Sequence, residues 1–289
     1  MFGPNKIVPI DIDINYCHRD TSFLNIIKEL KDVFRDKFNL NSYDILFIPG
    51  SGTSGIESLF FSCKNKINVI GNNGVFHDRW DKMSTVYDYK EKNDIKNLYC
   101  QLETSNSSLF SKPGCYVDAV SSFPFYDIPP NTEVFVTSSN KILGAIPGCA
   151  IVAVKKDNWG HFISDTIVST LNLNRFKKYI DKNQTPTTPP VQVIWHLLEC
   201  LKIYDTNKTK ENIIKNSNLI TSSIGVENII GEKICPVITI PKSLIPIELA
   251  KKYELYHLNT NDNTYQIFTY SDKDKYYEYF ANDINSIKK

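Results

Sequence analysis

Hydrophobic residues recur at two different spacings along the first 180 residues of the chain. Helical spacing over residues 22–38 is set by the apolar side chains Phe23, Ile26, Ile27, Leu30, Val33, Phe34 and Phe38. Short β-branched runs predict buried strands at residues 44–48, 67–70, 115–117, 133–137 and 150–154, and a second helix is expected over residues 56–62. Strands that alternate with amphipathic helices favour an α/β sheet with mostly parallel strands and crossover helices.

The pattern changes after residue 180. Residues 181–190 (DKNQTPTTPP) are rich in Pro and Thr, which excludes regular structure there. A helix is predicted over residues 191–203, and the remainder reads as helices near 208–219, 244–252 and 273–283 with strands at 236–241 and 264–269. We therefore expect a large α/β domain in residues 1–205 and a small α+β domain in residues 206–289.

Composition narrows the class of protein without identifying it. The chain has 289 residues, of which 42% are hydrophobic and 22% charged, as in an ordinary globular protein. A formal net charge of +1 gives no reason to expect nucleic acid or a membrane surface as a partner. No apolar run approaches the roughly 20 residues that cross a bilayer, and the first residues (MFGPNK) lack a signal-peptide core. A cytoplasmic protein is the default expectation.

Cysteine usage argues against two kinds of site. The seven cysteines are scattered, odd in number and form no CxxC pair, which fits neither a disulfide framework nor a zinc site. We expect most of them to be small buried hydrophobic residues, and we expect no metal.

A glycine-rich turn at residues 48–55 (IPGSGTSG) lies directly after a predicted strand and before a predicted helix. Glycines let the backbone approach an anion, and the helix N-terminus presents free N–H groups. Ser51 and Thr53 add hydroxyl donors beside Gly52. Such a turn is either a phosphate cradle or a plain strand-to-helix connection, and it lacks the lysine of a P-loop.

Two charged residues follow predicted strands. Asp118 ends an apolar strand, where open α/β sheets build their ligand crevice. It is either a cap for the next segment or a partner for a positively charged ring nitrogen. Lys141 lies in a hydroxyl-rich segment before a Gly/Pro turn. A lone lysine is usually a solvated surface group, but among apolar neighbours its amine loses a proton more readily and can form a Schiff base.

An aromatic residue completes the set. Phe76 stands in residues 72–80 (NNGVFHDRW), which we expect to form a loop after a strand, and it is either a platform for a planar ring or a core side chain. Pyridoxal 5′-phosphate (PLP) needs anion donors for its phosphate, an aromatic for its ring face, a carboxylate for its ring nitrogen and an amine for its aldehyde. The four features meet these needs in order, so the sequence predicts a PLP enzyme with its cofactor on Lys141.

The same motifs resemble those of the class V aminotransferases of the type I PLP fold, most closely the 2-aminoethylphosphonate–pyruvate transaminase branch. The similar segments are residues 15–23 (NYCHRDTSF), 50–53 (GSGT), 73–80 (NGVFHDRW), 103–105 (ETS), 117–123 (VDAVSSF), 138–141 (SSNK) and 187–191 (TTPPV). They run in one order over about residues 15–200. The resemblance implies a type I PLP-transferase fold with a mostly parallel sheet in the large domain and a small α+β C-terminal domain.

The resemblance also implies a role for individual residues. The phosphate would be bound by Ser51, Gly52, Thr53 and, from the neighbouring subunit of a homodimer, Thr188. Phe76 would stack on the cofactor ring, Thr104 and Asn140 would contact the cofactor, Asp118 would face the pyridine nitrogen and Lys141 would form the Schiff base.

Two departures from the family pattern stand out. The stretches between residues 80 and 101 and between 107 and 115 are too brief for the usual strand–helix pairs, which predicts missing peripheral helices. Gln266 stands where the family has an arginine for the substrate carboxylate, and a neutral amide supplies no bidentate charged clamp. Arg19 and Arg79 are the other candidates for binding an acidic substrate group.

The predicted function is transfer of an amino group from a small amine resembling 2-aminoethylphosphonate to an oxo acid such as pyruvate. Lys141 would act as general base and acid at the substrate carbon. Two alternatives stay open: a PLP-dependent lyase or decarboxylase on the same scaffold, and a catalytically silent relative.

Overall fold

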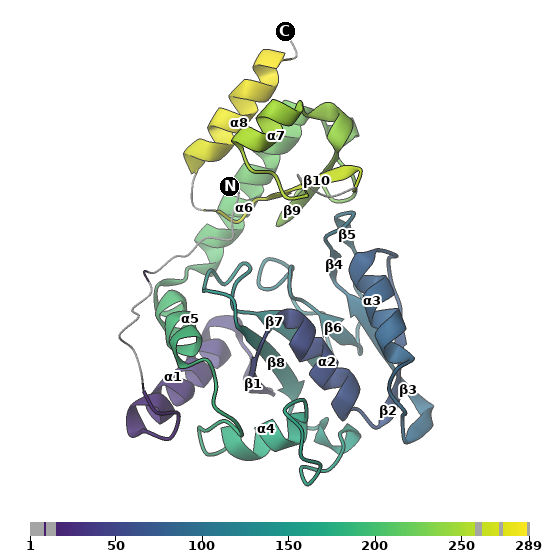
Figure 1. Cartoon of the computed structure of the whole chain (residues 1–289), viewed down its shortest axis with the longest axis vertical. Coiled ribbons are helices and arrows are strands. Elements are labelled where there is room, and N and C mark those ends of the chain that lie inside the picture. Colours follow the sequence, from purple (N-terminus) through teal and green to yellow (C-terminus); the bar gives the residue numbers. More distant parts are fainter. Residues whose placement is uncertain (1–8, 10–15, 258–261, 272–273, 288–289) are drawn as a thin grey trace.

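Two units, each with its own hydrophobic core, make up the chain in a computed structural model that describes residues 9, 16–257, 262–271 and 274–287 (Figure 1). The large unit comprises the elements from α1 to α5, and the small unit those from α6 to α8. We propose the predicted division at residues 205 and 206 as the domain boundary. The N-terminal residues 1–6, Asn15 of the first matched segment and Lys273 of the expected closing helix lie outside the described residues.

A six-stranded sheet forms the centre of the large unit. Its strands are β1 (Tyr43–Pro49), β2 (Asn65–Val69), β3 (Glu91–Cys100), β6 (Tyr116–Asp118), β7 (Val134–Ser138) and β8 (Cys149–Lys155). The order across the sheet is β1-β8-β7-β6-β3-β2, and β8 is antiparallel to both of its neighbours. The neighbouring pairs among β2, β3, β6 and β7 are all parallel. The carboxyl ends of five strands therefore meet at one edge, which confirms the mostly parallel sheet.

Helices cover the two faces of this sheet. On one face, α2 (Gly52–Ser62) approaches so closely that a Cβ on Gly55 would lie 2.7 Å from Val136 Cγ1. On the other face lie α1 (Thr21–Phe38) and α5 (Val191–Ile203), and the Phe38 ring packs 4.9 Å from that of Phe123, which is itself 5.3 Å from Phe135. Because Val136 and the adjacent Phe135 point to opposite faces of β7, the sheet is enclosed between these helices.

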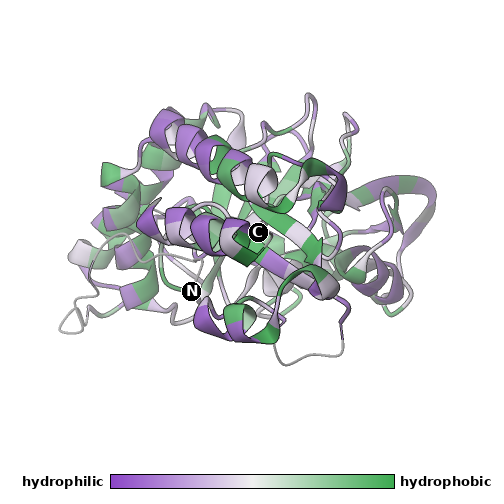
Figure 2. Ribbon diagram, turned by 90° about the horizontal axis from the view of Figure 1, so that it is seen from above, coloured by the Kyte–Doolittle hydropathy of each residue, from purple (hydrophilic) through white to green (hydrophobic). Residues whose placement is uncertain are grey.

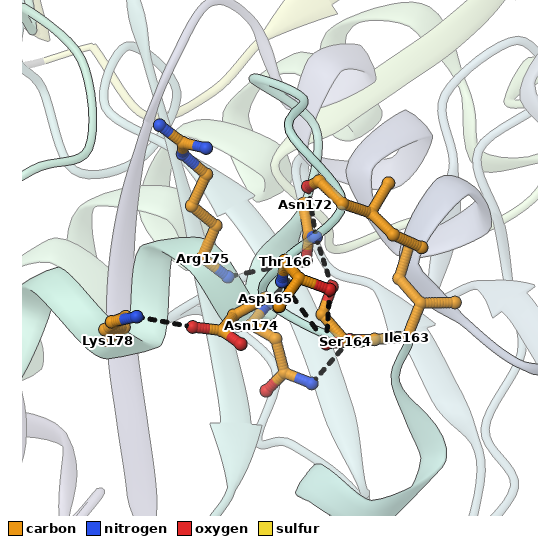
Figure 3. A network of polar contacts seen from close by, with 9 residues as sticks. Ile163, Ser164, Asp165, Thr166, Asn172, Asn174, Arg175 and Lys178 are labelled. Atoms are coloured by element: carbon orange, nitrogen blue, oxygen red, sulfur yellow. Dashed lines mark hydrogen bonds and ion pairs between the residues drawn. The ribbon is translucent and has the colours of Figure 1, made fainter.

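Two helices of the large unit are not in the sequence prediction. The expected loop at residues 72–80 is wrong, because α3 (Val75–Ser84) begins there. The second, α4 (Leu173–Ile180), starts at the cap residue Asn172, whose side chain accepts a hydrogen bond from the Asn174 backbone N–H at 3.0 Å. The Asn172 amide also donates to the carbonyls of Ser164 and Ile167, so the helix start is tied to the preceding loop (Figure 3).

The edge of the sheet at β6, β3 and β2 is covered more sparsely. Between β3 and β7 the described chain forms no helix, only the small hairpin of β4 (Leu102–Glu103) and β5 (Ser108–Leu109) and the strand β6. Phe110 from the loop after β5 packs its ring 5.1 Å from Tyr99 of β3. This arrangement agrees with the missing peripheral helices expected from the short spacing.

The small unit packs three helices on a two-stranded antiparallel sheet. Its elements are α6 (Thr206–Ile224), β9 (Val237–Pro241), α7 (Ile247–Lys252), β10 (Thr264–Phe268) and α8 (Asp274–Ile287), with short 3-10 turns at Val226–Asn228 and Lys242–Leu244 here and at Trp159–His161 in the large unit. Tyr265 and Ile267 point into its core, so Gln266 and Phe268 occupy the opposite face of β10. Seen from the small-unit end, the strands are mainly hydrophobic and the helices mixed (Figure 2).

The cysteine expectation is confirmed: all seven thiols are free and, apart from the exposed Cys17, buried. No helix in the described part of the chain combines the length and hydropathy that a bilayer crossing requires.

Candidate active site

Lys141 lies in the turn that follows β7. Its backbone carbonyl accepts a hydrogen bond from the Gly144 N–H at 3.0 Å. Its side chain is half-buried, and Nζ lies 5.5 Å from the ring centroid of Phe268 at the end of β10. Burial lowers the pKa of Lys141, and the negative charge of Asp118 opposes that shift. The Lys141 side chain is therefore not fully solvated, and its uncharged, nucleophilic form is less disfavoured than that of a lysine in water.

Asp118 ends β6 and is 3% exposed. Its Oδ2 accepts a hydrogen bond from the Trp80 indole at 2.9 Å, and Oδ1 accepts one from the Val120 backbone N–H at 3.0 Å. Burial raises the pKa of Asp118 to about 6, while these two hydrogen bonds oppose the shift. Each carboxylate oxygen retains acceptor capacity. A cation placed beside Asp118 would restore the charged form that burial disfavours.

The glycine-rich turn brings the start of α2 close to the Asp118 segment. The helix begins at Gly52, and the first backbone N–H groups of any helix have no partner within it. A Cβ on Gly52 would lie 2.4 Å from Val120 Cγ2, so only glycine fits there without displacement. Ser51 is exposed and Thr53 half-exposed, and both flank this N-terminus. The helix begins at Gly52, four residues before the predicted start at residue 56. The N–H groups of its first turn therefore belong to the glycine-rich turn itself.

Ser138 is a site residue that the sequence reasoning did not select. Its hydroxyl is buried, and neither it nor the neighbouring Thr137 hydroxyl has a hydrogen-bond partner among the described residues. Ser138 pairs with Ala150, against which Gly55 of α2 packs, so it shares a sheet face with that helix. Buried hydroxyls without partners are rare in proteins. A bound anion at the start of α2 would give the Ser138 hydroxyl an acceptor.

Glu103 is a second residue that was missed. It is fully buried, and its Oε2 accepts hydrogen bonds from the backbone N–H groups of Phe76 and His77, both at 3.0 Å. These are N–H groups of the first turn of α3, so the carboxylate caps that helix from a distant strand. A Cβ on Gly74 would lie 2.2 Å from Glu103 Cγ, which explains the glycine before α3. Glu103 therefore fixes the orientation of the helix that carries Phe76 and Trp80.

Phe76 and Arg79 lie together on this helix. The Phe76 ring is half-buried, 6.2 Å from that of Trp80 and thus close to the residue that binds Asp118. The exposed guanidinium of Arg79 lies 5.1 Å from the Phe76 centroid, within the range of a cation–π contact. The helix therefore presents one aromatic face and one cation next to the Asp118 cluster.

Thr104 and Gln266 meet where the two units touch. The buried Thr104 offers its carbonyl oxygen to Gln266 Nε2 at 2.7 Å and to the Thr239 hydroxyl at 3.2 Å. Gln266 is 5% exposed. The amide that stands in place of the family arginine therefore ties β10 to the β4–β5 hairpin.

Other predicted site residues lie outside this cluster or beside it. Arg19 is exposed, donates to Gln184 Oε1 at 2.8 Å and lies 5.4 Å above the Tyr179 ring; no contact in the described chain joins it to Lys141 or Asp118. Thr188 is exposed in the segment before α5, and Asn140 is half-buried next to Lys141. The reach of Thr188 into a neighbouring subunit stays a prediction.

Comparisons with curated proteins find distant relatives, among them a hydrogenase subunit and an aminotransferase. No protein-family model matches it. It is 25% identical over 221 residues to a soluble hydrogenase 42 kDa subunit from Anabaena cylindrica, covering 61% of this chain and 57% of that protein. It is 26% identical over 232 residues to a phosphoserine aminotransferase from Leuconostoc mesenteroides, covering 68% of this chain and 62% of that protein. The chain thus spans about three fifths of the length of these relatives.

Solved structures confirm the fold. A phosphoserine aminotransferase from Cytophaga hutchinsonii superimposes with a TM-score of 0.75 and 15% identity over 94% of this chain and 90% of its own. A subgroup IV aspartate aminotransferase from Thermus thermophilus gives 0.78 and 14% over 94% and 92%. A PLP-bound phosphoserine aminotransferase from Trichomonas vaginalis gives 0.70 and 13% over 94% and 90%. The type I α/β fold predicted from the sequence is the fold of this chain.

Proposed function

We propose that this chain is a PLP-dependent aminotransferase. The observation that carries the proposal is the pairing of Lys141 with Asp118, whose charges interact. Burial lowers the pKa of the Lys141 amine and raises the pKa of the Asp118 carboxyl to about 6. Such opposed shifts in one site are typical of catalytic groups. The fold shared with aminotransferase structures and the likeness to a phosphoserine aminotransferase support the same reading.

The residues of this site fit PLP. Ser138 supplies a buried hydroxyl that lacks a partner, and Gly52 brings the α2 N-terminus against the Asp118 segment. The phosphate would be held by Ser51, Gly52, Thr53 and Ser138, and the remainder of the cofactor by Phe76, Thr104, Asp118, Asn140 and Lys141. When bound, PLP supplies an aldehyde for the amine and a ring that accepts electrons.

The chain's own groups would then bind the cofactor and move protons. The Asp118 carboxylate, held by Trp80 and Val120, would stabilise positive charge on the ring nitrogen. Lys141, whose pKa is lowered by burial, would take the proton from the substrate carbon bonded to nitrogen and later donate a proton to complete the amino transfer. Phe268 above Nζ would keep bulk water from that amine.

The substrates form the finer part of the proposal. We infer a small amine resembling 2-aminoethylphosphonate as donor and an oxo acid such as pyruvate as acceptor. Gln266 carries no charge and already donates to Thr104, so it offers a neutral amide to an acidic group. Arg79 beside Phe76 is the cation that we propose for this role, because Arg19 is engaged with Gln184 and Tyr179.

The assembly and location complete the proposal. We propose a homodimer in which Thr188, exposed in the single chain, contacts the phosphate bound by the neighbouring subunit. The protein would act in the cytoplasm on small molecules, without nucleic acid, membrane or metal.

The test is an absorption spectrum of the purified protein with PLP, before and after addition of 2-aminoethylphosphonate. The proposal predicts a yellow band that bleaches to the pyridoxamine form and returns with pyruvate. A band that ignores this donor but bleaches with other amines would change only the substrate. A yellow band that returns during turnover without an added oxo acid would favour the lyase or decarboxylase alternative. The absence of any band would favour the catalytically silent relative.

A further inference from the structure

The loop that carries Lys141 is held together by its own hydrogen bonds. The Ser139 hydroxyl donates to the Ile146 carbonyl at 2.7 Å, and the Ala145 N–H donates to the Ser139 carbonyl at 2.9 Å. The Gly144 N–H donates to the Lys141 carbonyl at 3.0 Å. Gly144 has φ 73°, in the left-handed region that glycine favours. These contacts close the loop over residues 139–148 into one compact turn.

One face of α5 holds this loop from outside. Val193, His196 and Cys200 are spaced three and four residues apart, so their side chains lie on the same side of the helix. His196 Nδ1 accepts a hydrogen bond from the Ile146 N–H at 3.3 Å, and the Cys200 thiol lies 3.6 Å from the Gly144 carbonyl oxygen. A Cβ on Gly148 would lie 3.1 Å from Val193 Cγ2. Helix α5 therefore touches the loop at three successive points.

The contact with His196 defines its chemical form. Because Nδ1 accepts the Ile146 N–H, Nδ1 carries no hydrogen and Nε2 is the ring nitrogen that bears one. His196 and Cys200 are both fully buried, and Cys200 Sγ lies 3.6 Å from Nδ1. An apolar side chain at position 196 would leave the Ile146 N–H without its acceptor, which loosens the turn that presents Lys141.

We propose that His196 is a positioning residue for Lys141: it fixes the residue 139–148 turn through Ile146 and so sets the direction of the amine. Cys200 supports the same turn at Gly144. This inference rests on the proposed function for the role of the amine, but the holding of the turn is a property of the chain alone.

The experiment compares His196→Leu, which removes the acceptor, with His196→Asn, whose Oδ1 can accept from the Ile146 N–H. The control is Ser62→Ala at the C-terminal end of α2. This change removes two hydrogen bonds, with the Leu171 carbonyl and the Leu173 N–H, and touches no part of the turn. Hydrogen exchange of residues 139–148 is measured without cofactor. The PLP dissociation constant and the pH midpoint of the visible band are measured with it.

For His196→Leu we expect at least tenfold faster exchange in the turn, about tenfold weaker PLP binding and a shift of the band midpoint by about one pH unit, in line with loss of one positioning contact. His196→Asn should bring the exchange rate and the PLP dissociation constant to within about threefold of the wild-type values and return the band midpoint to that of the wild type. Ser62→Ala should lower the melting temperature and leave all three quantities unchanged. Unchanged exchange and an unchanged midpoint in His196→Leu would overturn the inference.

The two proposals fail separately. If the wild-type protein shows no visible band with PLP, the proposed function fails, and hydrogen exchange alone decides whether His196 holds the turn. If the band is present but His196→Leu keeps its midpoint and its exchange rates, the function stands and His196 is merely a core residue.

Discussion

The large unit and the small unit each contribute a wall to the region around the site, and the two walls differ in the charge of their polar side chains. The wall from the large unit contains two buried carboxylates, Asp118 and Glu103, each held by N–H donors. The wall from the small unit presents the neutral Gln266 and the Phe268 ring. The first wall therefore carries two carboxylates, one of which we propose for the cofactor, whereas the second wall offers only a neutral amide and an aromatic ring. The predictions below alter one wall at a time.

The largest effect should come from removing the Asp118 charge. Asp118→Asn keeps an oxygen for one hydrogen bond but loses the negative charge opposite the proposed ring nitrogen. We expect the rate of amino transfer in a single turnover to fall on the order of 10³-fold, as for other buried electrostatic groups. Trp80→Phe, which keeps the carboxylate and removes one donor to it, should cost about tenfold. Equal rates in Asp118→Asn and wild type would remove Asp118 from the mechanism.

The same carboxylate should make stability depend on pH. Its pKa is raised from 3.8 to about 6, so the folded state favours the protonated form. This contribution is fully present below pH 3.8 and lost as the pH rises through about 6, which amounts to about 3 kcal/mol by the free-energy equivalent of a pKa shift. The free energy of unfolding of the cofactor-free protein, minus that of Asp118→Asn, should fall over this interval. A difference that is flat with pH would contradict the burial argument.

Removal of the second carboxylate should act on stability before catalysis. Glu103→Ala leaves the Phe76 and His77 N–H groups without their acceptor, and we expect a loss of about 2 kcal/mol in the free energy of unfolding by denaturant. Glu103→Gln keeps an acceptor oxygen and should recover at least half of this. If both variants unfold like the wild type, the cap on α3 does not stabilise the fold.

The smallest effect should come from the small-unit wall. Gln266→Arg places a cation where the neutral amide stands, and kcat/KM for an oxo acid should rise about tenfold through a charge-assisted contact. The neutral control Gln266→Met should not show this gain. A rise in both variants would mean that loss of the Thr104 contact, rather than charge, controls the substrate preference.

The sequence predicted the large-unit wall better than the small-unit wall, for a physical reason. Asp118 ends β6 and Lys141 follows β7, and a regular sheet brings strand ends to one edge. Three residues that the sequence analysis did not select stand inside motifs that it had identified: Trp80, Glu103 and Ser138. The available signal was the presence of an indole, a carboxylate and a hydroxyl in those motifs, and the structure shows that these groups are buried. Phe268 lies near Lys141 because the small unit contacts the large one. The local pattern of hydrophobic and polar residues does not predict a contact between residues so far apart in the sequence.

Missed helices have a similar explanation. Helix α3 starts at Val75 because the side chain of Glu103, distant in sequence, binds its first N–H groups. Helix α4 depends on Asn172 and the loop that it ties down. By contrast, α1 and α5 follow from apolar spacing alone, and their structural bounds agree with the prediction within one residue.

Borohydride reduction of the protein with PLP, followed by peptide mass mapping, tests the central claim most directly. Reduction converts a lysine-bound cofactor into a stable adduct. The account predicts that the added mass lies on the peptide containing Lys141 and disappears in Lys141→Ala. The control Lys96→Ala, which removes an ammonium that pairs with Glu133, should retain the added mass. Adduct on a different lysine, or none on Lys141 while the protein remains folded, would contradict the account.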